Sequence, residues 1–215
     1  MDMQHTLFTS LWGRDTLDES SENYCIILAA GLSRRLGKDK ALIEVGGRPL
    51  VSAMAQMMVG HGLKVCVVSS SEWDEEEVPL FGAVMCINHN PDTGRTGSIK
   101  YGLSALGWPK RVIIAPVDRP GFSSETLRRL VESDVCACPS NEGRGGHPIL
   151  LDASAVESVR NALPDTPLRS LCDPLRFQVE DPHLSLNVDT EADVERLRSD
   201  WPEIESSWKV NTHPE

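Results

Sequence analysis

The sequence has no long apolar run and too few basic residues to balance its acidic ones. No segment approaches the roughly 20 consecutive apolar residues of a membrane-spanning helix, so no membrane-embedded part is predicted. The 21 Lys and Arg residues are outnumbered by 32 Asp and Glu residues, which gives a formal net charge of −11. Nucleic acids and anionic membrane surfaces are held by distributed Lys and Arg side chains. The composition therefore excludes both as general partners, and a polyanionic ligand must bind at a local positive site.

Two further absences narrow the class of protein. The first 24 residues lack the basic n-region and compact apolar segment of a secretory signal, so we expect a cytoplasmic protein. The six cysteines lie mostly within apolar stretches, where a reducing cytosol would keep them as small core residues. Cys136 and Cys138 stand two residues apart, but no second Cys/His pair has the spacing of zinc ligands, which disfavours a zinc site.

Short apolar runs alternate with helical patterns through about residue 135, and 215 residues suffice for one sizeable core. This alternation predicts an α/β fold with a doubly wound, mostly parallel sheet, helices on both faces and a ligand at the carboxyl edge. The predicted strands lie within residues 24–31, 63–70, 83–89 and 111–120, and the predicted helices within 49–62, 97–106 and 122–133.

The chain is predicted to contain one domain with two extensions. We expect an N-terminal extension over residues 1–22, a domain over 23–200 and a C-terminal tail over 201–215. Residues after about 135 are less regular and predict a small insertion on the acceptor side, covering the nucleotide edge. A final strand and a helix capped by Thr190 are expected to follow.

One short segment concentrates positive charge on this acidic chain. Residues 28–42 read LAAGLSRRLGKDKAL and contain two glycines and the cations Arg34, Arg35, Lys38 and Lys40. The spacing excludes a P-loop, because five residues separate the glycines and Lys38 is followed by aspartate. The dinucleotide fingerprint is also excluded, since its second glycine is missing. A strand that ends in small residues, a glycine turn and nearby cations still indicate a phosphate ligand.

This segment resembles the L-A-A-G-x-S-x-R-[MF]-G-x-x-K signature of MobA-like nucleotidyltransferases, a family that includes molybdenum-cofactor cytidylyl- and guanylyltransferases. Three further segments are similar to motifs of that family: PVDRPGFSSETLRRLVE, GRGGHPILL and NVDTEADVERL. The four matches occur in the family's order and span residues 26 to 197. The resemblance implies a Rossmann-like nucleotidyltransferase fold.

The same resemblance assigns roles to residues of this chain. It implies that a nucleoside triphosphate is bound by Leu28, Ala29, Ala30, Gly31, Ser33, Arg34 and Gly37, with Ser98 near the base. Lys40, Arg35 and Asp118 are implied as the catalytic residues, and Asp118 and Asp189 as the ligands of Mg²⁺. His147 and Arg119 are expected beside the acceptor.

Nucleotidyl transfer requires these residue types on chemical grounds, independently of the resemblance. A phosphate that attacks the α-phosphorus of a triphosphate must overcome repulsion between anions, which requires Lys or Arg and a divalent cation. Mg²⁺ usually takes only one or two carboxylates. A phosphate monoester is already a nucleophile, so the absence of Ser-His-Asp or Cys-His motifs is consistent with this reaction. The expected reaction joins NMP to a phosphorylated acceptor, with CTP favoured because L-A-A-G resembles the cytidylyl-using members.

Several alternatives stay open at this level. Each candidate residue also fits a purely structural role: Lys40 as a solvated lysine, Asp118 as a turn residue at the end of a strand, and Asp189 as a cap before the Thr190 helix. Molybdopterin is the leading acceptor, and a sugar, polyol or phosphonate-type acceptor is the alternative. A nucleotide-binding chaperone or regulatory module without turnover is the non-enzyme hypothesis. The sequence leaves the oligomeric state open.

Overall fold

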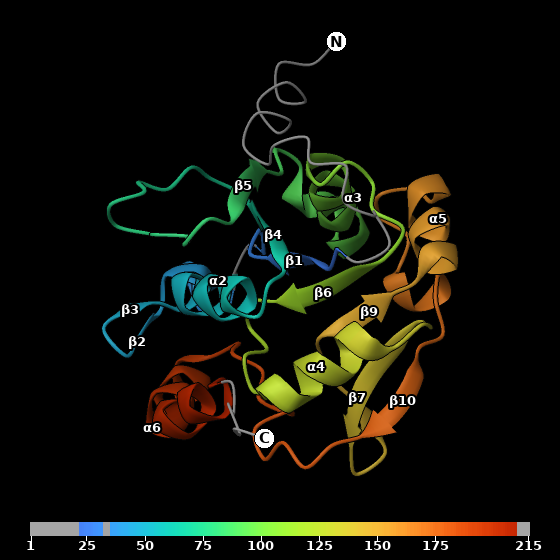
Figure 1. Ribbon diagram of the computed structural model, residues 1–215. Coiled ribbons are helices and arrows are strands. Elements are labelled where there is room, and N and C mark those ends of the chain that lie inside the picture. The colour runs from blue at the N-terminus through green and yellow to red at the C-terminus, as the bar shows by residue number, and fades with distance from the viewer. Residues whose placement is uncertain (1–21, 32–34, 210–215) are drawn as a thin grey trace.

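One mixed sheet organises the computed structural model of the chain, which describes residues 22–31 and 35–209 (Figure 1). Its main path has the order β10-β7-β9-β6-β1-β4-β5, and β8 pairs with β7. The strands are β1 (Tyr24–Leu28), β4 (Lys64–Ser69), β5 (Val84–Ile87), β6 (Val112–Pro116), β7 (Ala137–Asn141), β8 (Arg144–Gly145), β9 (Ile149–Leu151) and β10 (Leu175–Gln178). β1 pairs in parallel with β4 and β6, and β4 pairs in parallel with β5. The predicted α/β fold with a mostly parallel sheet is confirmed.

Helices cover both faces of this sheet, as predicted. The α-helices are α2 (Leu50–Gly60), α3 (Arg95–Ala105), α4 (Ser124–Glu132), α5 (Ala153–Asn161) and α6 (Glu191–Ser207), and the 3₁₀ turns are η1 (Lys40–Leu42), η2 (Pro91–Thr93) and η3 (Leu168–Ser170). Helices α2, α4 and α6 bury their apolar side chains against one face, and α3 and α5 against the other. Strand β1 is apolar throughout because successive side chains enter opposite cores, Ile26 on one face and Ile27 on the other.

The segment after residue 135 extends the sheet. Strand β9 lies antiparallel between β6 and β7, and β10 adds to β7 in parallel. The expected small insertion is therefore built into the central sheet and does not stand apart from it. The physical reason is the apolar run Ile149–Leu151, which gains burial and backbone hydrogen bonds by pairing with β6.

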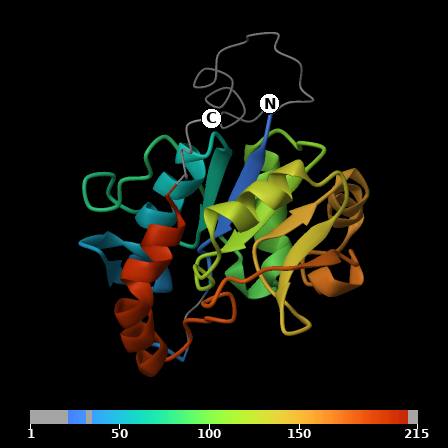
Figure 2. The same ribbon diagram turned by 60° about the horizontal axis from the view of Figure 1, so that its bottom comes forward.

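Two predictions near the C-terminus are also corrected. No strand precedes the last helix within residues 184–189; instead, the Val188 amide donates to the Asp118 carbonyl over 3.0 Å. Helix α6 begins after Thr190 as predicted but continues to Ser207, so the tail does not start at residue 201. Trp201 and Trp208 are 4% and 6% exposed and belong to the core. Figure 2 shows α6 beside α2 and the hairpin of β2 (Glu44–Val45) and β3 (Arg48–Pro49).

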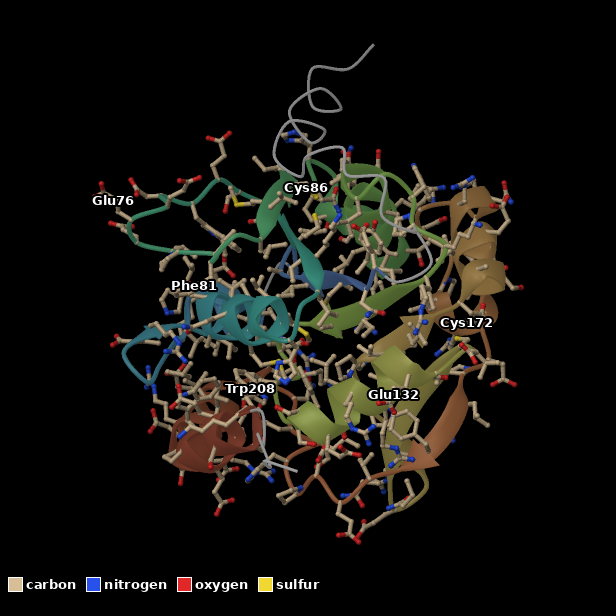
Figure 3. All side chains as sticks on the ribbon, in the orientation of Figure 1. Glu76, Phe81, Cys86, Glu132, Cys172 and Trp208 are labelled. Atoms are coloured by element: carbon tan, nitrogen blue, oxygen red, sulfur yellow. The ribbon has the colours of Figure 1, made fainter. Side chains whose placement is uncertain are left out.

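The remaining features agree with the composition. Five of the six cysteines are buried and all six are free thiols, as expected for small core residues. The described residues contain no cluster of three or more His, Cys, Asp and Glu side chains with metal-site geometry. None of the helices in the described part of the chain has the length and apolarity needed to cross a membrane. The acidic loop between β4 and β5 projects outwards, with Glu76 on its outer side (Figure 3).

Candidate functional site

The carboxyl ends of β1 and β6 open into a cavity of about 230 Å³. The backbone continues the sheet hydrogen bonding one residue past each strand, since Ala29 donates to Val68 and Val117 donates to Leu28. The cavity is lined by Leu28, Ala29, Ala30, Gly31, Lys40, Pro91, Gly94, Arg95, Ser98, Pro116, Val117 and Asp118. A ligand site at this edge of a doubly wound sheet is the position that the strand order predicts.

Lys40 joins two carboxylates that are far apart in the sequence. Its Nζ lies 3.2 Å from Asp118 Oδ2 and 2.5 Å from Asp189 Oδ1. The three side chains are only 13%, 24% and 16% exposed, so solvent screens this contact less than it screens a surface ion pair. The structure therefore assembles the predicted residues into one cation–carboxylate cluster at the cavity.

Each member of the cluster is held by its local backbone. Lys40 begins η1, and the Asp39 side chain caps this turn by accepting from the Ala41 amide. Asp118 follows β6 in a turn closed by a hydrogen bond from the Arg119 amide to the Pro116 carbonyl. Because tight turns have defined backbone dihedral angles, they fix the backbone from which these two side chains project.

Asp189 is held by the start of α6. The Asp193 carboxylate accepts from the Thr190 hydroxyl and amide and from the Asp189 amide, and the Thr190 hydroxyl accepts from the Asp193 amide. This capping box fixes the first turn of the helix. Because one of its hydrogen bonds comes from Asp189 itself, the box also orients the candidate metal ligand.

A glycine brings the segment before Asp189 close to the loop after Asp118. A Cβ atom on Gly121 would lie 1.8 Å from the His183 carbonyl oxygen, a distance that no side chain tolerates. Glycine at this position thus permits the close approach of two backbones. The segment that it admits carries Asp189 to the cavity edge, where the Val188 amide bonds the Asp118 carbonyl.

Electrostatics keep Asp189 ionised. The hydrogen bond from Lys40 lowers the pKa of the Asp189 carboxyl below its usual range, with further contributions from Asn187 and Arg35. The Asn187 side-chain amide donates to Asp189 Oδ2 over 2.5 Å, and Arg35 reaches the same oxygen over 2.8 Å. The carboxylate is a ready ligand for a cation at neutral pH.

The residues present suit a divalent cation. The Lys40 ammonium lies between oxygens of Asp118 and Asp189, which shows that a positive charge is accommodated between these two carboxylates. Two carboxylates without histidine or thiolate partners form a hard oxygen donor set, as Mg²⁺ and Mn²⁺ prefer, with phosphate and water completing the shell.

The residues predicted for the nucleotide are only partly described. Leu28, Ala29, Ala30, Gly31 and Ser98 line the cavity. Arg35 is 73% exposed and pairs with Asp189, outside the cavity lining. Gly37 adopts a left-handed backbone conformation with φ of 71°, which glycine permits. Ser33 and Arg34 lie outside the described residues.

The two residues predicted beside the acceptor, Arg119 and His147, are not part of the cavity lining. Arg119 directly follows Asp118, and His147 precedes Pro148 through a cis peptide bond at the start of β9. Desolvation by burial, with the nearby charges of Arg95 and Arg119, lowers the pKa of His147 to about 3. The imidazole is therefore neutral at physiological pH.

Sequence reasoning missed two features of the cavity. Arg95, the first residue of α3, lines it, and the only signal in the sequence is a cation after the helix-starting Gly94. The fully buried Asn88 donates to the Ser98 hydroxyl over 3.0 Å and thereby orients that side chain. Asn88 directly follows strand β5, as polar residues at a ligand edge often do.

Comparison with known proteins gives a family match over residues 25–180, to the MobA-like NTP transferase domain. A nicotine blue oxidoreductase of Paenarthrobacter nicotinovorans is 30% identical, over 64% of this chain and 74% of the relative. A molybdenum cofactor guanylyltransferase of Xanthomonas euvesicatoria pv. vesicatoria is also 30% identical, over 62% and 67%. The molybdenum cofactor cytidylyltransferase of Escherichia coli K12 is 23% identical, over 84% and 97%.

Solved structures support the fold. A nucleotidyl transferase from a Methanothermobacter species superposes with a TM-score of 0.70 at 18% identity, covering 85% of this chain and 98% of that one. A manganese complex of the Rv0371C protein from Mycobacterium tuberculosis H37Rv has a TM-score of 0.65 at 17% identity, covering 83% and 98%.

Proposed function

The chain belongs to the family of MobA-like NTP transferase domains, and from this premise we propose that it transfers NMP from a nucleoside triphosphate to a phosphorylated acceptor and releases pyrophosphate. The observation that carries the proposal is the contact of Lys40 with Asp118 and Asp189 at the cavity edge. A cation and two carboxylates at the carboxyl end of a parallel sheet suit phosphoryl chemistry, where positioning and charge neutralisation supply most of the catalysis.

We assign separate tasks to the members of the cluster. Lys40 would contact the triphosphate and offset its negative charge, while Arg35 would reach the outer phosphates from the turn. The backbone from Ala29 to Gly31, together with Ser33, Arg34 and Gly37, would wrap the phosphates, and Ser98, fixed by Asn88, would face the nucleoside. These groups hold the α-phosphorus in line with the incoming oxygen.

We propose Mg²⁺ as the metal, held by Asp118 and Asp189. When bound, the ion would supply Lewis-acid stabilisation of the charge that develops on the phosphate oxygens. Support comes from the hard donor set and from a neighbour of similar fold that was solved with manganese. Within the protein, the contact with Lys40 favours the charged form of the Asp189 carboxyl. The capping box of α6 fixes the position of Asp189 through its backbone amide.

We propose CTP as the donor and molybdopterin as the leading acceptor. Ala30 supports CTP through the L-A-A-G resemblance, while two of the relatives compared are named for guanylyl and cytidylyl transfer. A sugar or polyol phosphate is the alternative acceptor. The proposed setting is the cytoplasm, where these phosphorylated metabolites occur.

The first test measures pyrophosphate release from each of the four nucleoside triphosphates with Mg²⁺ and a panel of phosphorylated acceptors. We expect release with one nucleotide, and a loss of at least 100-fold in kcat/KM in Asp189→Asn. Asp134→Asn, which removes a carboxylate from an exposed loop, is the matched control and keeps full activity. Full activity in Asp189→Asn would overturn the assignment of the site.

The same assay decides between the competing classes. Tight nucleotide binding without pyrophosphate from any acceptor would identify a nucleotide-binding regulatory or chaperone module. Oxidation of a substrate with no pyrophosphate would identify chemistry like that for which the 30% identical oxidoreductase is named. The cation–carboxylate cluster favours transfer over both, because Lys40 would offset phosphate charge and the two carboxylates would hold a divalent metal ion.

A further inference from the structure

Asp189 reaches the cavity edge at the end of a strap, residues 181–189, which connects β10 to α6 (orange in Figure 1). Two successive turns, each closed by a backbone hydrogen bond, make up residues 181–186. Near the other end, the Val188 amide donates to the Asp118 carbonyl over 3.0 Å. These bonds make the strap a compact connection, so a displacement of its start is passed on to Asp189.

The carboxylate of Asp181 fixes the start of the strap. Asp181 is only 8% exposed, and its Oδ2 atom accepts hydrogen bonds from the Ser123 amide over 3.0 Å and the Thr126 hydroxyl over 2.6 Å. Burial of a carboxylate is costly unless hydrogen bonds compensate for the water that it loses. Both compensating donors belong to the start of α4, so the carboxylate joins the strap to that helix.

This link completes the N-terminal cap of α4. The Ser123 side chain accepts from the Thr126 amide over 3.2 Å, which is one half of a capping box. In the other half, the third helical residue returns an acceptor to the amide of the capping residue. Thr126 stands at that position but donates its hydroxyl to Asp181. Asp181 therefore supplies the missing acceptor from a position 55 residues further along the chain than Thr126.

The start of α4 is also the end of the loop that carries Asp118. Only residues 119–122 separate Asp118 from the capping residue Ser123. Gly121 in this loop admits the backbone of the strap, since a Cβ atom there would lie 1.8 Å from the His183 carbonyl oxygen. The loop and the strap are therefore held together from α4 to the cavity, where they present the two candidate metal ligands.

We propose that Asp181 is a positioning residue for the metal site: by joining the strap to α4, it sets the place of Asp189 relative to Asp118. The inference rests on the proposed function and deepens it by naming a residue that controls the metal-binding geometry from outside the cavity lining. Mg²⁺ and Mn²⁺ take octahedral oxygen sites, and Mg²⁺ demands near-ideal geometry. Loss of the link lets the strap shift along the loop, which weakens metal binding.

The strap keeps other contacts when the carboxylate is removed. The Asn141 side-chain amide donates to the Asp181 carbonyl over 3.3 Å, and the Val179 amide donates to the Ser140 carbonyl over 3.0 Å. The acceptors in both bonds are backbone atoms, which remain when the Asp181 side chain is replaced. They hold the start of the strap to β7, so we expect Asp181 variants to fold and to lose only the link with α4.

The test measures Mn²⁺ affinity by paramagnetic resonance in the full chain, at a temperature where circular dichroism shows every variant folded. In Asp181→Ala, we expect the dissociation constant for Mn²⁺ to rise about 10-fold, the lower end of what lost supporting contacts cost a metal site. The dissociation constant for nucleotide without metal should stay unchanged. Pyrophosphate release should fall at low Mn²⁺ and return at saturating Mn²⁺, because both metal ligands are still present.

Two further variants test the link itself. Asp181→Asn retains an acceptor oxygen for the donors on α4 and should recover most of the loss in Mn²⁺ affinity. Thr126→Val removes one of the two donors from the α4 side, so it should weaken Mn²⁺ binding less than Asp181→Ala does.

Asp152 offers a matched control. Its carboxylate caps α5, which has nine residues like α4, by accepting from the Ala155 amide, and it also accepts from the Cys136 amide of a distant segment. This link holds neither the strap nor the loop after Asp118. Asp152→Ala should therefore lower stability and leave the Mn²⁺ affinity unchanged.

Three outcomes would overturn the inference. Unchanged Mn²⁺ affinity in both Asp181→Ala and Thr126→Val, or an equal loss in Asp181→Ala and Asp152→Ala, would reduce Asp181 to a helix cap. An equal loss in Asp181→Asn and Asp181→Ala would assign the effect to the charge of Asp181. All three leave nucleotidyl transfer intact, whereas failure of the proposed function appears in the wild type, as absent nucleotide binding and absent pyrophosphate release.

Discussion

Lys40 contacts both carboxylates of the site, and this geometry predicts that its two roles can be separated. In Lys40→Met, the nucleotide loses a phosphate contact, so we expect its dissociation constant to rise at least 10-fold. The affinity for Mn²⁺ without nucleotide should stay equal or increase, because Asp118 and Asp189 lose a competing cation. Calorimetry measures the first quantity and Mn²⁺ paramagnetic resonance the second. Asp189→Asn should instead weaken Mn²⁺ binding more than it weakens nucleotide binding without the metal. If both variants lost affinity for Mn²⁺ and for the nucleotide to the same extent, the two roles of Lys40 would not be separable.

The same ion pair predicts a pH dependence of stability. Lys40 lowers the pKa of Asp189 in the folded state, so the pairing stabilises the fold above the unfolded-state value of about 3.9. The stabilisation is lost as the pH falls through the lower folded value. The difference in free energy of unfolding between wild type and Lys40→Met should therefore shrink from pH 6 towards pH 2, as urea titrations at each pH would show. A constant difference would mean that Lys40 acts through packing alone.

The cluster could be predicted at the residue level because its members stand next to strong local signals. Lys40 follows a glycine turn, Asp118 ends an apolar strand and Asp189 precedes a helix cap. Arg95 carries no such signal, since a cation at a helix start is usually solvated. Its place at the cavity depends on how α3 packs on the sheet, which a local pattern does not determine.

At the scale of elements, the capping box of α6 should affect both stability and metal binding. Thr190→Ala removes the hydroxyl that pairs with Asp193, and such losses cost about 1 kcal/mol. Because Asp193 also bonds the Asp189 amide, we expect weaker Mn²⁺ binding in the same variant. Thr190→Ser keeps the hydroxyl and is the control for both measurements. Lost stability with unchanged Mn²⁺ affinity would separate the cap from the site.

The last turns of α6 should contribute a large share of the packing. Trp208 stacks edge-on with Trp201 at 5.1 Å and donates from its indole nitrogen to the Phe122 carbonyl over 2.8 Å. Figure 3 shows it where α6 meets the rest of the molecule. We expect Trp208→Ala to lower the free energy of unfolding by about 3 to 5 kcal/mol. The exposed neighbouring residue Lys209 offers a control, since Lys209→Ala should change the free energy of unfolding little. A small effect of Trp208→Ala would mean that α6 adds little to the core.

This end of α6 was missed from the sequence for a physical reason. Residues 201–215 are polar and lack sustained periodicity apart from isolated apolar side chains, which favoured a tail from residue 201, and Pro202 lacks an amide donor and normally ends or kinks a helix. In the structure the helix continues, because Trp201, Ile204 and Trp208 follow the i, i+3, i+7 spacing and bury their side chains. Tertiary packing thus outweighs the local cost of the proline.

For the whole molecule, the half of the sheet nearest the N-terminus was predictable and the other half was not. Strands β1, β4, β5 and β6 are continuous apolar runs separated by helical patterns or turns, which identify a parallel sheet. Strand β9 has three residues, and its antiparallel place depends on pairing with β6 and β7. Such long-range register leaves little trace in a short segment. The predicted insertion therefore proved to be part of the sheet.

The same long-range construction predicts how ligands affect global stability. Lys40 contacts residues 78 and 149 positions away, so a ligand held by the cluster joins the first and last parts of the fold. At 100 times its dissociation constant, a nucleotide with Mg²⁺ should stabilise the chain by about 2.7 kcal/mol. For a domain of this size, the melting temperature rises by roughly 5 to 11 °C. Asp189→Asn should abolish most of this increase, while Asp134→Asn should keep it. An equal increase in both variants would show that the nucleotide binds away from the Lys40 cluster, because only a ligand that uses Asp189 loses its stabilising effect with that carboxylate.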